Sequence, residues 1–173
     1  MAVLGLITTL LVAQTARMIT GIPGINYVFT IVLAIETSFS MLMYEGRRWR
    51  FLCQMILFVI ITTPTNLGGP PFDITARLNT IINAFICDLA FNSIYGRFKE
   101  HKKLLLWVII ATVAFWVMNP FISSLVKPIF FPPEYVAAFI SAVLLLLPVI
   151  IIEAAIGGYV GYKIYGRVKR VQN

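Results

Sequence analysis

Six apolar stretches, separated by short links rich in charged residues, Gly or Pro, follow one another along the whole chain. A helix needs about 20 apolar residues to cross a bilayer, and most of these stretches approach that length. We therefore predict an all-α protein, an integral membrane bundle of six helices that forms one transmembrane domain over residues 1–173. The predicted spans cover residues 3–19, 27–44, 51–63, 78–95, 104–122 and 136–165.

The composition excludes a soluble domain. Hydrophobic residues make up 60% of the 173 positions and charged residues 12%, and the mean hydropathy is +0.90. Six spans and their links leave no room for a soluble lobe. The chain also lacks a GxxxxGK[ST] phosphate loop and a Ser/His/Asp set. We therefore expect neither an enzyme nor a cofactor.

The basic residues gather in alternate links, which predicts the orientation of the bundle. Eleven of the 14 Lys and Arg residues fall on one side and three on the other. Because cytoplasmic loops carry the excess of positive charge, both termini are predicted to be cytoplasmic. The net charge of +7 thus indicates membrane orientation and not nucleic-acid binding. The larger set is Arg47, Arg48, Arg50, Arg97, Lys99, Lys102, Lys103, Lys163, Arg167, Lys169 and Arg170; the smaller is Arg17, Arg77 and Lys127.

Residues 62–88 interrupt the apolar pattern with prolines, glycines and Asn66 before a helix that carries a polar stripe of Asn79, Asn83 and Asp88. The preceding span is short, so the irregular segment can begin at membrane depth. Backbone of that kind occurs there only when it packs against protein or lines a cavity. The alternative is an outer loop after a short tilted helix.

Three acidic residues fall near the middle of alternate spans: Glu36, Asp88 and Glu153. No span has a basic residue at matching depth. A carboxylate at the centre of a bilayer costs about 3 kcal/mol on insertion scales, so each acid must face the protein interior. The three could bind a cation or an amine-bearing solute, relay protons, or form hydrogen bonds with polar neighbours.

Metal-ligating residues do not cluster. The only histidine, His101, lies among the lysines of a basic link, and Cys53 and Cys87 have no CxxC or Cys/His spacing. No metal site is expected.

Small residues at four-residue spacing mark two faces on which helices can approach closely. The first consists of Gly5, Thr9 and Ala13, and the second of Gly157 and Gly161. We predict contact with a partner subunit at both faces. Packing inside the bundle is the alternative for the first.

Four passages together resemble the membrane-embedded substrate-binding component of an energy-coupling-factor vitamin transporter. They are TARMITGIPGINYVFTIVLAI, LGGPPFD, AFICDLAFNSIYGRFK and LLLPVIIIEAAIGGYVGYKIYGRVKR, and the last is the most specific. The resemblance implies a multi-pass protein of the cell membrane that captures a vitamin or related small molecule from outside. It also implies a transmembrane scaffold subunit and two ATPase subunits as partners.

The same resemblance implies a binding site. Residues 20–27 would cap it, residues 65–73 would form a second wall, and the fourth to sixth predicted spans would form its floor. The substrate-binding residues would be Asn26, Tyr27, Asn66, Asn79, Asn83, Asp88, Tyr135 and Glu153. The chain departs from the family in its first helix, where Gly5, Thr9 and Ala13 replace the common Ala-x-x-x-Ala motifs. It also lacks the histidine-rich N-terminus of the cobalt and nickel members, which disfavours a metal substrate.

Two other functions fit the same sequence features. The chain could be a non-catalytic accessory subunit that packs against other subunits of a membrane enzyme complex. It could also conduct protons or cations along Glu36, Asp88 and Glu153. We rank substrate capture first, the accessory subunit second and the conducting pathway third; a fold alone does not define a function.

Overall fold

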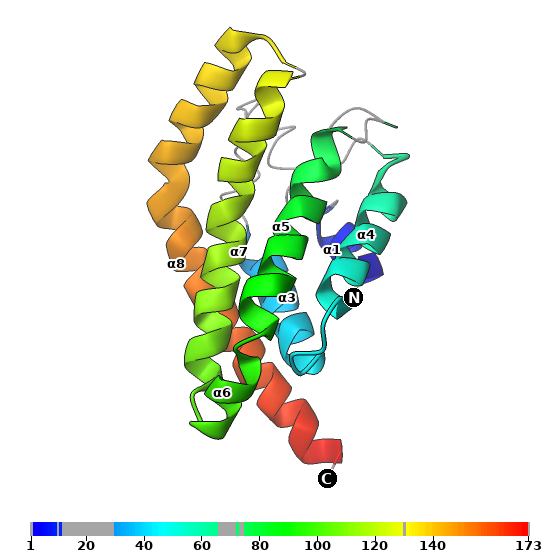
Figure 1. Ribbon diagram of the computed structural model, residues 1–173, viewed down its shortest axis with the longest axis vertical. Coiled ribbons are helices and arrows are strands. Elements are labelled where there is room, and N and C mark those ends of the chain that lie inside the picture. Colours follow the sequence, from blue (N-terminus) through cyan, green and yellow to red (C-terminus); the bar gives the residue numbers. More distant parts are fainter. Residues whose placement is uncertain are drawn as a thin grey trace.

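The computed structural model describes residues 2–9, 11, 30–65, 72, 75–129 and 131–172. These residues are almost all helical, and none of them forms a strand, so the all-α prediction is confirmed for the described part (Figure 1). The elements are α1 (Ala2–Thr8), α3 (Ile31–Met43), α4 (Arg50–Thr62), α5 (Thr75–Asn92), α6 (Tyr95–Glu100), α7 (Leu104–Val126), the short 3-10 helix η3 (Lys127–Ile129) and α8 (Pro133–Gln172).

A helix occupies each of the six predicted apolar stretches, although the first two stretches are described only in part. The short third stretch is a 13-residue helix, as its sequence indicated. Two differences stand out. The link after α5 contains the additional helix α6, and α8 continues to Gln172 with Lys169 and Arg170 in its last turn. Basic side chains there interact favourably with the helix dipole, which explains the extension.

Two helical segments are long and apolar enough to cross a membrane: Leu104–Ile129 and Pro133–Val171. Helices α3 and α4 are apolar but shorter. Pro120 and Pro148 lie inside α7 and α8, and neither ends its helix. These lengths support association with a membrane, and the arrangement of six spans remains a prediction.

The helices form a closed ring of neighbours, in which α1 contacts α4, α4 contacts α5, α5 contacts α7, α7 contacts α8, α8 contacts α3, and α3 returns to α1. Helix α3 also contacts α7 across the ring. Helices α7 and α8 form a long antiparallel pair on one side of the molecule (Figure 1).

Glycines on α8 bring α3 to backbone distance. A Cβ atom on Gly157 would lie 2.4 Å from the Cβ of Ala34, and one on Gly161 would lie 2.9 Å from the carbonyl oxygen of Ile35. The hydroxyl of Ser38 donates to the carbonyl oxygen of Gly157 at 3.1 Å. The predicted partner-contact face is therefore covered by α3 of the same chain, because the pattern indicates close approach without saying which helix approaches.

Gly158, the residue after Gly157 on α8, lets α7 approach closely in the same way. A Cβ atom on Gly158 would lie 3.1 Å from the Cα of Ile109. Consecutive glycines thus hold two different helices against one turn of α8.

The hydrophobic core lies where α4 begins and α5 ends, and aromatic rings fill it. Phe51 and Phe115 pack edge to face with ring centroids 5.3 Å apart, and Tyr95 and Trp107 do so at 5.0 Å. All four side chains are buried. Such pairs add about 0.5–1.5 kcal/mol each beyond the area that they bury.

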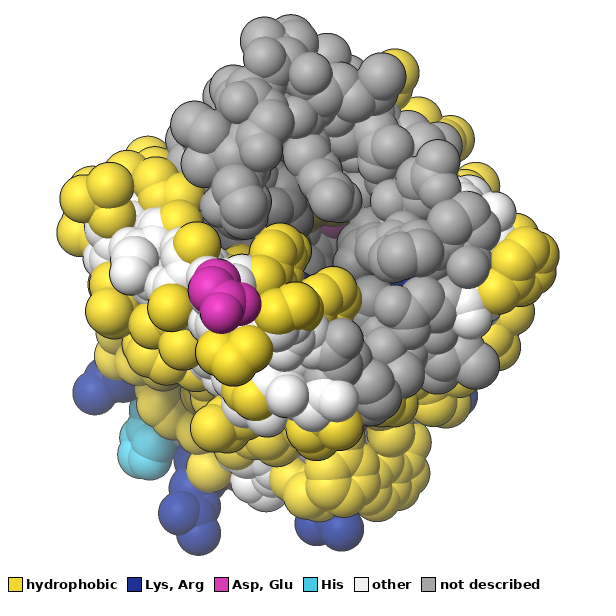
Figure 2. Space-filling view, turned by 90° about the horizontal axis from the view of Figure 1, so that it is seen from above, with side chains coloured by type: hydrophobic (Ala, Val, Ile, Leu, Met, Phe, Trp, Pro, Cys, Tyr) yellow, Lys and Arg dark blue, Asp and Glu magenta, His cyan; other side chains and the backbone are white. Residues whose placement is uncertain are grey.

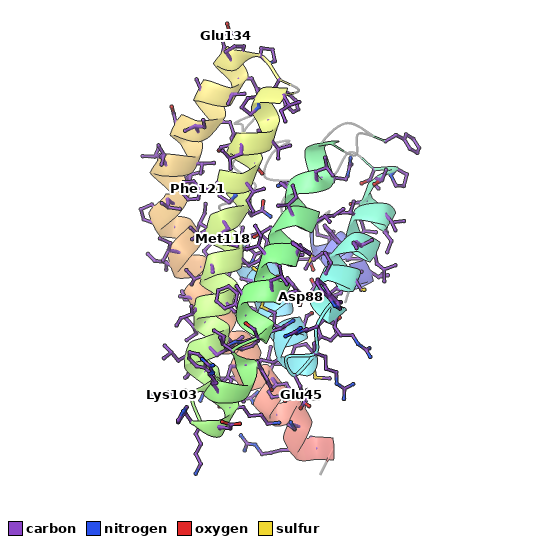
Figure 3. All side chains as sticks on the ribbon, in the orientation of Figure 1. Glu45, Asp88, Lys103, Met118, Phe121 and Glu134 are labelled. Carbon is purple, nitrogen blue, oxygen red and sulfur yellow. The ribbon has the colours of Figure 1, made fainter. Side chains whose placement is uncertain are left out.

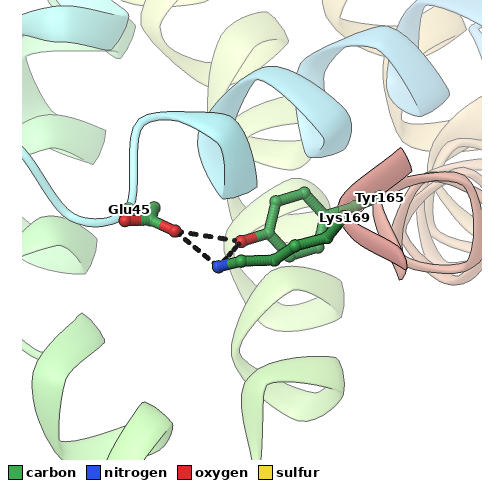
Figure 4. Close-up of polar contacts among 3 residues, drawn as sticks. All are labelled: Glu45, Tyr165 and Lys169. Atoms are coloured by element: carbon green, nitrogen blue, oxygen red, sulfur yellow. Dashed lines mark hydrogen bonds and ion pairs between the residues drawn. The ribbon is translucent and has the colours of Figure 1, made fainter. Parts of the chain in front are cut away.

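A cluster of Glu45, Tyr165 and Lys169 joins the link after α3 to the last turns of α8 (Figure 4). The ammonium of Lys169 donates to Glu45 Oε1 at 2.7 Å and to the hydroxyl oxygen of Tyr165 at 2.9 Å, while the Tyr165 hydroxyl donates to Glu45 at 3.2 Å. The hydrogen bond from Lys169 lowers the pKa of Glu45, and the bond to Glu45 raises the pKa of Lys169. Both side chains are more than one third exposed, so the pair contributes less than about 1 kcal/mol.

We expect Gly157→Ala to destabilise the protein, by about 1–3 kcal/mol, because the new methyl group would overlap a methyl group that has no flexible end to move aside. Gly166→Ala is the matched control, since a Cβ there meets nothing within 4 Å. The control should gain about 0.5–1 kcal/mol from helix propensity. Thermal unfolding in detergent measures both changes, and equal shifts would contradict the proposed contact.

The interaction between Glu45 and Lys169 should depend on pH in a defined direction. The stability that Glu45 contributes is present above the ordinary pKa of 4.5 and is lost as the pH falls through its lowered value in the folded state. The stability that Lys169 contributes is present below the ordinary pKa of 10.5 and is lost as the pH rises through its raised value. A double-mutant cycle with Glu45→Gln and Lys169→Met should show coupling at neutral pH and none after Glu45 is protonated.

Candidate functional site in the bundle interior

Charge divides the bundle into two ends. Glu134 lies at one end, whereas Lys103 and Glu45 lie at the other (Figure 3). The basic links and the basic tail of α8 all follow or precede helix ends at this second end, which we call the basic end. Seen from the opposite end, the described surface is mostly hydrophobic, with Lys and Arg side chains chiefly along the lower margin (Figure 2).

A buried polar cluster joins α5 to α7 in the half of the bundle away from the basic end. Asn79 Nδ2 donates to Asn119 Oδ1 at 3.0 Å and to Ser123 Oγ at 2.6 Å. One turn along α5, Asn83 Nδ2 donates to the carbonyl oxygen of Phe115 at 2.7 Å. We call Asn79, Asn83, Asn119 and Ser123 the amide cluster.

Two oxygens of the amide cluster, Oδ1 of Asn79 and Oδ1 of Asn83, are buried and have no hydrogen-bond partner among the residues that the structure describes. The orientation of Asn83 is fixed by its neighbour, because the carbonyl of Phe115 can only accept and therefore faces the nitrogen. An unpaired buried acceptor costs about 1–3 kcal/mol. The cluster therefore has spare capacity to accept hydrogen bonds.

Asp88 joins α5 to the beginning of α4 at the basic end. Its Oδ2 accepts from the backbone amide of Leu52 at 2.8 Å, in the first turn of α4, and its Oδ1 accepts from the side chain of Asn92. The first amides of a helix have no partner within the helix, so Asp88 supplies one from α5. The structure therefore places Asp88 level with the beginning of α4 and apart from the amide cluster.

Glu153 ties the middle of α8 to the beginning of α3. Its Oε2 accepts from both the backbone amide and the hydroxyl of Thr30, each at 2.8 Å. Thr30 is buried and immediately precedes α3. This carboxylate therefore joins two helices by capping one of them.

Glu36 faces α1. The two carboxylate oxygens would lie 3.1 and 3.2 Å from a Cβ atom on Gly5, and Phe58 of α4 lies on the same side at 3.4 Å. Gly5 is buried, and the hydroxyl of Thr9 donates to its carbonyl oxygen at 2.7 Å. Packing inside the bundle, the alternative to partner contact, is thus what Gly5 does, while Ala13 lies outside the described residues.

Tyr135 lies in the first turn of α8, at the end of the bundle opposite the basic end, and contributes to an aromatic cage around Lys127. The Tyr135 ring stacks on Phe131 with centroids 5.0 Å apart. The Lys127 ammonium lies 4.9 Å from the ring centroid of Phe131, 5.5 Å from that of Tyr135 and 4.7 Å from that of Phe139. Cation–π contacts of this kind hold the turn between α7 and α8 together.

Arg77, assigned from the sequence to the outer side, is only 3% exposed. Its Nη2 donates to the carbonyl oxygens of Thr62 and Thr65, at 3.1 and 2.8 Å. Carbonyls at the end of a helix lack partners within it, so this guanidinium completes the end of α4.

Of the predicted substrate-binding residues, Asn79 and Asn83 share one cluster, whereas Asp88, Tyr135 and Glu153 each have separate partners. Asn26, Tyr27 and Asn66 lie outside the described residues. The sequence reasoning missed Asn119 and Ser123, although their four-residue spacing places both on one face of α7. No group of three His, Cys, Asp or Glu that could hold a metal ion occurs in the part of the chain that the structure describes.

The described chain is an all-α protein with two apolar helices of membrane-spanning length and a polar interior contact between α5 and α7. No protein-family model, curated protein or solved structure matches it.

Replacing Asp88 by Ala should lower the free energy of unfolding by about 1–3 kcal/mol, because the partly buried amide of Leu52 loses its acceptor. Asp88→Asn keeps an acceptor oxygen and should cost less. Ser93→Ala, at an exposed position just after α5 whose hydroxyl donates to the nearby carbonyl oxygen of Ala90, is the control. Thermal unfolding reports the three values, and an Asp88→Ala protein as stable as the control would exclude the capping role.

Proposed function

We propose that this protein is the membrane-embedded substrate-capture subunit of an energy-coupling-factor type transporter, and that it binds a vitamin or a related small solute from outside the cell. The observation that carries the proposal is the amide cluster. Its buried acceptor oxygens lie in the half of the bundle away from the basic end.

Polar groups inside a membrane bundle are costly unless they have partners or a function. Asn79 and Asn83 use their nitrogens to join α5 to α7, and within the described ranges their oxygens have no partner. A polar solute with N–H or O–H groups would complete these bonds. Because both oxygens are enclosed, access to them requires a change in the packing around the cluster.

The aromatic core at the basic end supports capture and argues against a channel. Phe51, Tyr95 and Trp107 fill this half of the bundle with buried rings. The buried ring of Phe115 packs on Phe51 in the middle of the bundle, where the Phe115 carbonyl oxygen accepts from Asn83. A solute that enters from the opposite end would meet a closed interior. Release on the cytoplasmic side would then need work from another subunit, which fits a component that depends on separate ATPases.

The acids also argue against a proton or cation pathway. Asp88 accepts from Leu52 and Asn92, and Glu153 accepts from Thr30. Glu36 packs against Gly5 on α1. No described hydrogen bond links one of these carboxylates to another, and the bonds of Asp88 and Glu153 are better explained by the helices that they join.

In this proposal the chain is a multi-pass protein of the cell membrane with both termini in the cytoplasm, and it assembles with a transmembrane scaffold subunit and two ATPases. The ATPases must be separate chains, because this sequence has no phosphate-binding loop.

A second candidate function is an accessory subunit of a membrane enzyme complex. It is favoured by the dense aromatic core and by the enclosure of the amide oxygens. Such a subunit would copurify with enzyme subunits and would bind no solute. Copurification with ATPases would support capture instead.

A solute-binding assay separates the two functions. Purified protein in detergent should show a raised melting temperature with at least one member of a panel of vitamins and precursors. A ligand at one hundred times its Kd adds about 2.7 kcal/mol of stability. Asn83→Leu keeps the size of the side chain but removes the acceptor, and it should weaken binding at least about tenfold, or about 1.4 kcal/mol.

Thr112→Val is the matched control for this assay. It removes another buried polar group, whose hydroxyl bonds only to the carbonyl oxygen of Val108 in the same helix. The control should bind as the unchanged protein does. If no member of the panel shifts the melting temperature, the capture function is contradicted.

A further inference from the structure

Three exposed arginines lie within four residues where the link after α3 enters α4: Arg47 and Arg48 in the link, and Arg50 at the first position of α4. No ion pair joins any of them to a carboxylate within the described ranges, where the only salt bridge is that of Lys169 with Glu45. Their charge is therefore not neutralised within the described part of the chain and is available to an anion.

An aromatic pair lies directly beside these arginines. Trp49 is 45% exposed and stacks on Phe85 of α5, which is 43% exposed, with ring centroids 5.8 Å apart. The same helix exposes Ile86 and Leu89 next to Phe85. The surface thus changes from guanidinium groups to an indole and then to aliphatic side chains.

Helix α5 fixes the position of this link. Asp88 accepts from the amide of Leu52, immediately after the arginines, and Asn92 donates to the carbonyl oxygen of Arg47 at 3.5 Å. Trp49 has a φ angle of +68°, and its stacking on Phe85 holds its side chain against α5. The basic groups are therefore presented from a supported backbone.

We propose that Arg47, Arg48, Trp49, Arg50 and Phe85 form a binding surface for an anionic phospholipid. The guanidinium groups match the geometry of a phosphate. Trp49 has the amphipathic character of side chains that lie at the level of lipid headgroups. The exposed apolar residues of α5 then pack against the acyl chains.

This order of side chains favours a lipid over an acidic protein partner. A soluble partner would pair with the arginines but leave the adjoining apolar face of Phe85, Ile86 and Leu89 uncovered. One phospholipid molecule would contact both the arginines, through its phosphate, and the apolar face, through its acyl chains. The inference rests on the chain lying in a membrane and not on solute capture, so it holds equally for an accessory subunit.

The test compares phosphatidylglycerol with phosphatidylcholine, each added to the full-length protein in detergent. Native mass spectrometry should show bound phosphatidylglycerol with at least a tenfold preference, and the melting temperature should rise only with the anionic lipid. The triple variant Arg47→Gln, Arg48→Gln, Arg50→Gln should lose this preference. The triple variant Lys99→Gln, Lys102→Gln, Lys103→Gln removes equal charge from another link and should keep it.

Three outcomes would overturn the proposal: equal affinity for the two lipids, equal loss of preference in the two triple variants, or an equal rise in melting temperature with inorganic phosphate. If the arginine triple variant does not fold, Arg48→Gln alone tests the surface, because Arg48 is exposed. That variant should lower the preference for phosphatidylglycerol, and an unchanged preference would count against the site.

Discussion

The architecture depends on the absence of side chains along one turn of α8. Gly157 and Gly161 admit α3, and Gly158 admits α7, so three helices meet there at backbone distance. Without a side chain in the way, carbonyl oxygens and Cα atoms become the packing surface, and the hydroxyl of Ser38 can bond to the backbone of another helix. In lipid, where burial of apolar side chains gives no net advantage, such close packing is what joins helices.

Around this junction, the two halves of the bundle are stabilised in different ways. The basic end is filled by aromatic rings in edge-to-face contact, which resist rearrangement because they are close-packed. The other half combines an apolar cluster of Phe139, Val143 and Ile150 on α8 with amide side chains that cross from α5 to α7. Polar contacts can exchange partners at small cost when a donor of equal quality is supplied. The bundle thus combines a half packed by aromatic rings with a half in which amide side chains join two helices.

The sequence allowed the helices to be located, because long apolar stretches between charged links have few alternative structures. It also identified the polar face of Asn79 and Asn83. Partners across the bundle could not be predicted, since they depend on helix rotation and on backbone groups. Nothing in the sequence around Leu52 indicates that its amide will bind Asp88. Nothing around Thr30 indicates that it will bind Glu153.

The same limit explains the assignment of the glycines. A GxxxG pair indicates that another helix approaches, but the identity of that helix follows only from the fold. Asn119 and Ser123 were overlooked for a related reason. They lie one turn apart in a strongly apolar helix, and their role becomes visible only when the fold brings Asn79 of α5 against them.

The bond between Glu153 and Thr30 gives the bundle a mechanical property. Thr30 is the point at which the chain enters α3, and two hydrogen bonds fasten it to the middle of the longest helix. A force applied to the chain at that point is therefore borne by α8 as well as by the first turn of α3. Since α8 extends from one end of the bundle to the other, the beginning of α3 is thereby fastened to the same helix that carries the basic tail.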